Sequence, residues 1–189
     1  SLDLQTFELK QTSWASKIVL GWTGTFSSKH YLDSIKSTLY ELDKFINMKI
    51  ILITNFDYSL EGLDYEIIRW KESSEISDLH KIDIGLYPLI QTDWSLGKGG
   101  LKALQYMAVG IPAIATDFGT VKDFITHKEN GFLVDAKEEW IASVKLLIEN
   151  PMLRKNIIIN ARETVESGYS VTSNKDKYLS IFKALLRKD

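Results

Sequence analysis

The chain has 189 residues, 44% of them hydrophobic, and its 23 Lys and Arg are nearly balanced by 25 Asp and Glu, so the net charge is −2. This length and apolar content predict one folded domain with its own core and exclude a disordered chain. The charge balance gives no reason to expect a nucleic-acid partner, and the absence of cysteine excludes disulfides and thiolate catalysis.

The longest apolar runs have only the length of a strand, and the first residues lack a signal-peptide pattern. We therefore expect a soluble, cytoplasmic protein whose association with the inner face of a membrane is peripheral at most. Residues 151–189 are more basic, with eight Lys and Arg against four Asp and Glu. This stretch is interpreted as a solvated helical face, with a membrane-facing or acidic-partner surface as the alternative.

Short β-rich runs alternate with helical patterns along the chain. Strands are predicted at residues 17–22, 49–54, 65–70, 82–87, 112–115 and 132–134. Helices are predicted between them at 31–45, 74–81 and 101–109, and a helical tail follows at 137–149, 151–167 and 172–187. This order predicts an α/β fold, a Rossmann-like, doubly wound parallel sheet of six strands with a helical C-terminal tail.

Sheets of this kind bind ligands beyond the carboxyl ends of their strands, where the strand order reverses. The loops that follow strands one, four and five are Thr23–His30, Leu89–Gly100 and Asp117–Lys122. We therefore expect these three loops to share one rim of the sheet and to form the ligand site.

The second of these loops ends in a glycine-rich turn that opens a helix. It reads G-K-G-G-L-K over residues 97–102. The first backbone N–H groups of a helix have no partner within it and lie at the positive end of its dipole, so they favour an anion. Because Lys98 and Lys102 flank this turn, it predicts a phosphate site. The turn at Gly24 and Thr25 is a second, weaker signal of the same kind.

Several motifs in this order resemble those of a known family. They are I-S-D-L-H-K-I-D-I-G-L-Y-P over residues 76–88, G-K-G-G-L-K-A-L-Q-Y-M-A over 97–108, G-I-P-A-I-A over 110–115 and N-G-F-L-V over 130–134. With them the chain resembles the C-terminal, donor-binding half of a GT-B glycosyltransferase, close to the family 4 retaining enzymes. The opening residues 1–7 resemble the inter-domain stretch of that family.

The resemblance implies a single nucleotide-sugar-binding domain, with residues 1–16 as inter-domain segment, 17–134 as Rossmann-like core and 135–189 as helical tail. It also implies that the N-terminal, acceptor-binding half is absent. The full enzyme would transfer a hexosyl group from a UDP- or GDP-sugar with retention, without a metal or cofactor, to a glycan or lipid-linked acceptor. Polysaccharide or lipopolysaccharide biosynthesis is the expected setting, and the isolated domain is expected to be inactive.

The family holds the donor diphosphate with an Arg and a Lys after the first strand. Here Thr25 stands at the Arg position and His30 at the Lys position, with Lys29 beside it, so Lys98 and Lys102 are expected to compensate. The predicted diphosphate-binding residues are Gly24, Thr25, Lys29, His30, Lys98, Gly99, Gly100, Leu101 and Lys102. For Lys29 and Lys98 an exposed lysine without a ligand is the alternative.

The family carries two glutamates eight positions apart, the E-x7-E motif. Gly97 and Gln105 stand at these positions here, so both acids are missing. The Gln105 side chain can still accept hydrogen bonds from ribose hydroxyls and donate to them, so it is predicted to bind the ribose. The alternative is that Gln105 is a half-exposed polar residue of the helix with no ligand. Leu101 and Leu104 are expected to point to the core. The resemblance places the donor-sugar loop at Gly97, Asp117 and Gly119, and the base at Trp70 and Lys71. A buried tryptophan that caps the sheet is the alternative for Trp70.

The missing acids leave a non-catalytic nucleotide-sugar-binding or assembly subunit as the alternative function. A GT-B epimerase or a receiver-like signalling domain would need acidic residues that are not evident. His80 and His127 lack partners at metal-ligand spacing, so no metal site is predicted. The variant Gly100→Asp is expected to abolish nucleotide binding and to keep a near-native fold.

Overall fold

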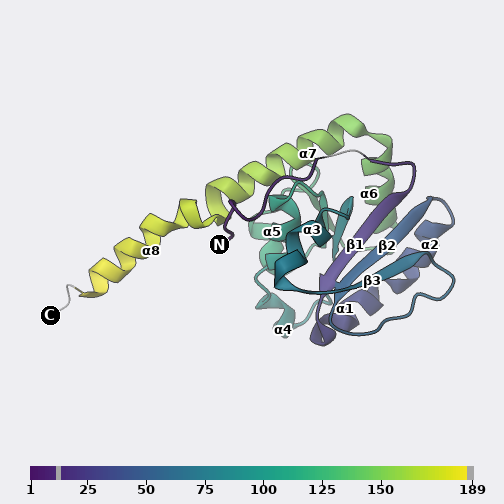
Figure 1. The fold of residues 1–189 in the computed structure, drawn as a ribbon, viewed down its shortest axis with the longest axis horizontal. Helices are drawn as coiled ribbons and strands as arrows, with labels where there is room; N and C mark the ends of the chain where they lie inside the picture. The colour runs from purple at the N-terminus through teal and green to yellow at the C-terminus, as the bar shows by residue number, and fades with distance from the viewer. Residues whose placement is uncertain (12–13, 187–189) are drawn as a thin grey trace.

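The computed structural model describes residues 1–11 and 14–186 and contains one sheet of six parallel strands (Figure 1). The strand order is β3-β2-β1-β4-β5-β6. The strands are β1 Ile18–Gly24, β2 Met48–Thr54, β3 Tyr65–Arg69, β4 Ile84–Tyr87, β5 Ala113–Thr116 and β6 Phe132–Val134. The predicted doubly wound α/β fold is confirmed, and the strand order reverses between β1 and β4.

Eight α-helices are described. They are α1 Lys29–Ser34, α2 Lys36–Asp43, α3 Glu75–Leu79, α4 Asp93–Leu96, α5 Leu101–Ala108, α6 Lys137–Glu149, α7 Pro151–Thr164 and α8 Val171–Leu186. Short 3-10 turns cover Phe26–Ser28, Glu72–Ser74 and Gly119–Asp123, and a π-helical turn, Val165–Tyr169, joins α7 to α8.

Each face of the sheet carries its own apolar cluster. One cluster packs α1, α2 and α6 on the sheet and includes Leu39 and Val144. The other packs α3 and α5 on the opposite face and includes Tyr106 and Met107. The α7 helix contributes Ile157 to the first cluster and Ala161 to the second, so it packs against the helical layers of both faces of the sheet.

The helix predicted at 31–45 forms as two helices. The Ser34 hydroxyl donates to the Tyr31 carbonyl at 2.6 Å, and Ile35 leaves the helical region with φ −103° and ψ 4°. A side-chain hydroxyl that bonds a carbonyl of the preceding turn competes with the helical pattern, which accounts for the break. The fourth strand begins at Ile84 rather than residue 82, because the Asp83 carboxylate accepts the Val19 N–H at 2.9 Å in place of a strand partner.

The N-terminal segment lies along the domain. Leu2 and Phe7 are buried, and the Arg162 guanidinium donates to the Phe7 carbonyl at 2.7 Å. The Leu2 N–H donates to Tyr169 O and the Val171 N–H donates to Leu2 O, both at 2.8 Å. The start of the described chain therefore lies beside the point where α8 begins (Figure 1).

The α8 helix extends away from the body of the domain (Figure 1), and none of its residues is buried. Its apolar side chains, including Leu179 and Phe182, are exposed. Arg187, at the end of the predicted helix, lies outside the described residues. None of the helices described here combines the length and the apolar character that crossing a membrane requires.

Candidate functional site

A cavity of about 480 Å³ opens at the carboxyl ends of β1 and β4, where the strand order reverses. This volume lies in the range of small-molecule sites. Seven of the predicted site residues line it: Gly24, Thr25, Trp70, Lys98, Gly99, Leu101 and Lys102. The predicted glycine–lysine turn and the predicted turn after β1 thus line the same cavity.

The burial of two pocket residues bears on what the sequence predicted for them. Leu101 was expected in the core, but its side chain is 50% exposed and lines the pocket, because it is the first residue of α5 and lies at the mouth of the cavity. Trp70 is 46% exposed, so the alternative of a buried sheet cap is wrong. Its ring forms part of the pocket wall.

The remaining predicted residues lie outside the described lining of the pocket. Lys29 pairs with Asp33 at 2.9 Å, and its ammonium lies over the ring of Tyr58. His30 is exposed and packs against Tyr31, and Lys71 is exposed beyond the pocket. These side chains therefore do not meet the glycine–lysine turn.

The predicted donor-sugar and ribose residues occupy other places around α5. Gly97 is the residue after α4, Gly119 opens the 3-10 turn after β5, and Asp117 pairs with Lys122 at 2.9 Å. Gln105 is buried rather than half-exposed. Its side-chain oxygen has no hydrogen-bond partner within the described chain.

The pocket also contains residues that the sequence did not single out. Trp22, Thr23 and Ser28 come from β1 and its loop, Asn55 follows β2, and Tyr31 comes from α1. Tyr87, Pro88 and Leu89 continue the wall after β4. The loops after β2 and β3 thus contribute to the pocket, whereas Asp117–Lys122 is not in its described lining. Gly119 of that loop packs against Ser95 and Leu96 of α4 instead.

Gly100 shapes the turn but does not line the cavity. It has φ +65°, a left-handed conformation that favours glycine, and a Cβ there would lie 2.6 Å from the ring of Phe124. Any side chain at this position strains the turn, so the structure argues against the expectation that Gly100→Asp keeps a near-native fold. Gly99 is exposed, and a Cβ there would meet nothing within 4 Å.

The two pocket lysines have different surroundings. The Lys102 ammonium lies 3.3 Å from the Glu75 carboxylate. The Lys98 ammonium lies 5.6 Å from the ring centre of Tyr31 and 6.0 Å from that of Trp94. Among the ion pairs found in residues 1–11 and 14–186, none involves Lys98. Of the two pocket lysines, Lys98 thus has no carboxylate partner in this part of the chain.

The loop that carries Lys98 is fastened on two sides. The Tyr31 hydroxyl lies 3.0 Å from the Ser95 hydroxyl in the buried part of α4, and the Thr120 hydroxyl donates to the Lys98 carbonyl. Thr92 caps α4 by accepting the Ser95 N–H at 3.3 Å. This small helix was predicted as loop, although threonine followed by aspartate is an ordinary signal for a helix start.

The floor of the pocket is a buried contact between β1 and α5. The Tyr106 hydroxyl accepts the Thr23 N–H at 3.0 Å, and the Tyr106 ring fills the space that a side chain at Gly85 would occupy. Burial raises the pKa of Tyr106, and burial likewise raises the pKa of the pocket residue Tyr87 to about 12. Both phenols therefore stay protonated at physiological pH and act as neutral hydrogen-bonding groups.

Residues 64–164, more than half of the chain, match the family described as glycosyl transferases group 1. A trehalose synthase from Pyrococcus horikoshii is 31% identical over 128 residues, which are 66% of this chain and 30% of that protein. The chain spans less than a third of the length of the curated relatives it matches.

Two solved structures have the same fold. The C-terminal domain of LpcC, a group 1 glycosyltransferase of Francisella tularensis, has a TM-score of 0.71 at 22% identity, covering 90% of this chain and 100% of that one. Anabaena HepE in complex with UDP and glucose has a TM-score of 0.75 at 16% identity, covering 97% of this chain and 55% of that one. The family match over residues 64–164 and this fold together show that the chain belongs to the group 1 glycosyltransferases and forms a C-terminal domain of the GT-B fold.

Proposed function

We propose that this domain binds the nucleoside diphosphate sugar that a retaining, metal-independent glycosyltransferase uses as donor. The observation that carries the proposal is the Lys98 ammonium beside the first turn of α5, which has no carboxylate partner among the described residues. The first helical hydrogen bond of α5 runs from the Leu104 N–H to the Gly100 carbonyl, so the amides before Leu104 are left without a helical acceptor. An anionic diphosphate is the ligand that matches both features.

The shape of the pocket supports a nucleotide rather than a bare phosphate. Trp70 and Asn55 lie at the ends of β3 and β2, and the lysines lie on the far side of β1, after β4. We assign the base to the Trp70 side and the diphosphate to Gly24, Thr25, Lys98, Gly99 and Lys102. HepE, which has the same fold, was crystallised with UDP and glucose, which agrees with this class of ligand.

The chemistry that these groups can supply is electrostatic. As the bond between sugar and diphosphate breaks, negative charge develops on the leaving diphosphate, and fixed N–H groups and ammonium groups around it stabilise that charge. The acceptor, a glycan or a lipid-linked glycan, would be bound by a separate N-terminal half. We place the full enzyme in glycan or polysaccharide biosynthesis in the cytoplasm.

Gly99→Asp tests the assignment of the diphosphate. Because Gly99 lines the pocket and has open space around it, the variant adds a negative charge without a steric clash. We expect binding of UDP or GDP, measured by calorimetry, to weaken about tenfold or more, which corresponds to about 1.4 kcal/mol.

The matched control is Gly99→Asn, which has the same shape without the charge and is expected to retain most of the affinity. Unchanged affinity in Gly99→Asp would show that the diphosphate lies elsewhere. A parent chain that binds neither UDP nor GDP would refute the proposed function.

The missing acids at Gly97 and Gln105 favour one second candidate, a nucleotide-sugar-binding subunit without transfer activity. Because glycine and glutamine stand at these positions, neither supplies a carboxylate. Gly97 also lies outside the described lining of the pocket, and Gln105 is buried. The two functions differ in turnover. Donor hydrolysis or sugar transfer by the full-length protein would support the enzyme, and binding without turnover would support the subunit.

A further inference from the structure

One carboxylate joins the two sides of the pocket. The Glu75 oxygen Oε1 accepts the Trp70 indole N–H at 2.9 Å and lies 3.3 Å from the Lys102 ammonium. Trp70 follows β3 and Lys102 belongs to the first turn of α5, so the carboxylate connects elements that are distant in sequence. Glu75 itself is not among the residues found to line the cavity, and its side chain is 17% exposed.

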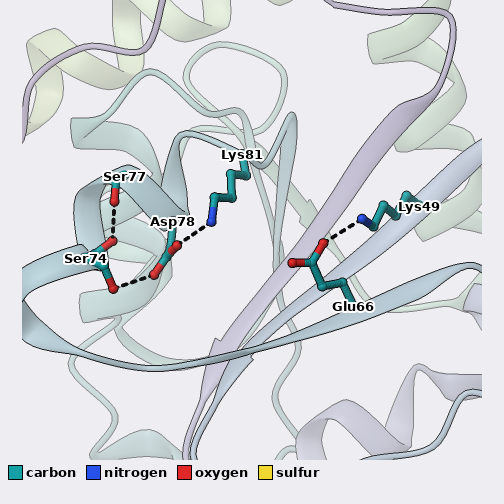
Figure 2. Close-up of polar contacts among 6 residues, drawn as sticks. All are labelled: Lys49, Glu66, Ser74, Ser77, Asp78 and Lys81. Carbon is teal, nitrogen blue, oxygen red and sulfur yellow. Dashed lines mark hydrogen bonds and ion pairs between the residues drawn. The ribbon is translucent and has the colours of Figure 1, made fainter.

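Glu75 is the first residue of α3, and a polar network lies in and beside this helix (Figure 2). The buried Asp78 carboxylate accepts from the Ser74 hydroxyl and the Lys81 ammonium, each at 2.7 Å, and the Ser77 hydroxyl donates to the Ser74 carbonyl at 2.9 Å. Two of these bonds join residues on either side of Glu75, so they stabilise the backbone turn that carries its side chain.

We infer that Glu75 is a positioning residue that raises the affinity of the site for the nucleoside relative to inorganic diphosphate; this rests on the proposed nucleotide site. Its carboxylate holds the indole of Trp70 in place on the base side. The same carboxylate offsets the positive charge of Lys102 on the phosphate side. Glu75 therefore strengthens contacts with the nucleoside and weakens the attraction for phosphate charge.

The two effects are separable because they depend on different properties of one side chain. A glutamine at position 75 keeps an oxygen that accepts the Trp70 N–H but removes the negative charge beside Lys102. An alanine removes both. Glu72 lies three residues earlier, is exposed, and has no ion pair among the described residues, so Glu72→Gln removes the same charge away from the pocket.

The experiment is calorimetry on this chain with four probes: UDP, GDP, the nucleoside of whichever nucleotide binds, and inorganic diphosphate. Glu75→Gln is expected to bind inorganic diphosphate about threefold to fivefold more tightly and to leave nucleoside binding within about twofold, as for one partly shielded charge pair. Glu75→Ala is expected to show the same gain for inorganic diphosphate and a loss of about fivefold for the nucleoside, because the Trp70 indole loses the acceptor that orients it. Glu72→Gln is expected to change neither.

The affinity ratio between nucleoside and inorganic diphosphate is the deciding quantity, since a general loosening of the fold would weaken both probes together. If Glu75→Gln leaves this ratio as in the parent, or weakens both probes equally, the role assigned to Glu75 is wrong while the nucleotide site stands. A parent that binds no nucleotide overturns the site and this inference together. Should Glu75→Ala fail to fold, the ratio measured for Glu75→Gln decides alone.

Discussion

Tyr31 connects α1 to the loop that carries Lys98. Its hydroxyl lies 3.0 Å from that of Ser95, and its ring lies beneath the Lys98 ammonium. We expect Tyr31→Phe to keep the ring but release α4, which lowers the free energy of unfolding by about 1 kcal/mol. Binding of UDP or GDP is expected to weaken as well, because Lys98 loses its fixed position.

Tyr40→Phe is the control for this variant. The Tyr40 hydroxyl also makes a single hydrogen bond, to the Glu61 carbonyl at 2.9 Å, but Tyr40 is not part of the described pocket lining. Denaturant unfolding and calorimetry of both variants separate stability from binding. If Tyr31→Phe binds nucleotide as the parent does, the hydroxyl has no part in placing Lys98.

The side chains at the pocket were only partly predictable from the sequence. The glycine–lysine turn and Thr25 were found because their residue types favour an anion wherever they occur. Tyr31 and Asn55 were missed because nothing in their local sequence distinguishes a pocket residue from a core or turn residue. Their role comes from the strand order, which brings the ends of β1, β2 and β4 together.

Among the elements, α6 depends on a carboxylate for its start. The side chain of Ala136, at the N-cap, has no oxygen that could accept a hydrogen bond. The Glu139 side chain instead accepts the N–H groups of Asp135 and Ala136 at 2.7 and 3.1 Å. These backbone hydrogen bonds from Asp135 and Ala136 hold the pKa of Glu139 below its usual value. The ionised form is therefore favoured in the folded state.

A lowered folded-state pKa gives a stabilisation that is present above the usual pKa of the carboxyl and lost as the pH falls through the folded value. We expect Glu139→Gln to melt at a lower temperature than the parent at pH 7, with the difference shrinking between about pH 5 and pH 3. Glu138→Gln, in the same turn but without a described bond to the backbone, is the control. A melting-temperature difference that is constant with pH would contradict this role.

The predicted elements were largely right because their signals are local. Alternating strands and helices were read from apolar periodicity, and Pro151 begins α7 as predicted. The break at Ile35 and the delayed start of β4 at Ile84 were not predictable in this way. Both depend on single side-chain bonds, one from Ser34 and one to Asp83, that form only when the local fold is in place.

For the whole chain, the N-terminal segment is held to the domain by a mostly buried ion pair. The Lys10 ammonium lies 2.7 Å from the Asp83 carboxylate and donates to the Ile82 carbonyl, and the two charged side chains are 12% and 7% exposed. We expect Lys10→Met to lower the free energy of unfolding by about 3 kcal/mol, since it leaves a buried carboxylate without its cation.

Lys17→Met provides the comparison. Lys17 pairs with Asp64 at 2.5 Å, but these side chains are 45% and 47% exposed, so the expected loss is about 1 kcal/mol or less. Urea unfolding of both variants measures the difference. Equal losses would mean that the N-terminal segment is not fastened through Lys10.

Gly85 and Tyr106 constrain each other across the floor of the pocket. A side chain at position 85 would overlap the Tyr106 ring, and a smaller residue at position 106 would leave a void and free the Thr23 N–H. A change at either position alone therefore costs stability unless the other side chain adjusts. This contact fixes the distance between β4 and α5, so the backbone beneath the pocket is set by two residues that do not line it.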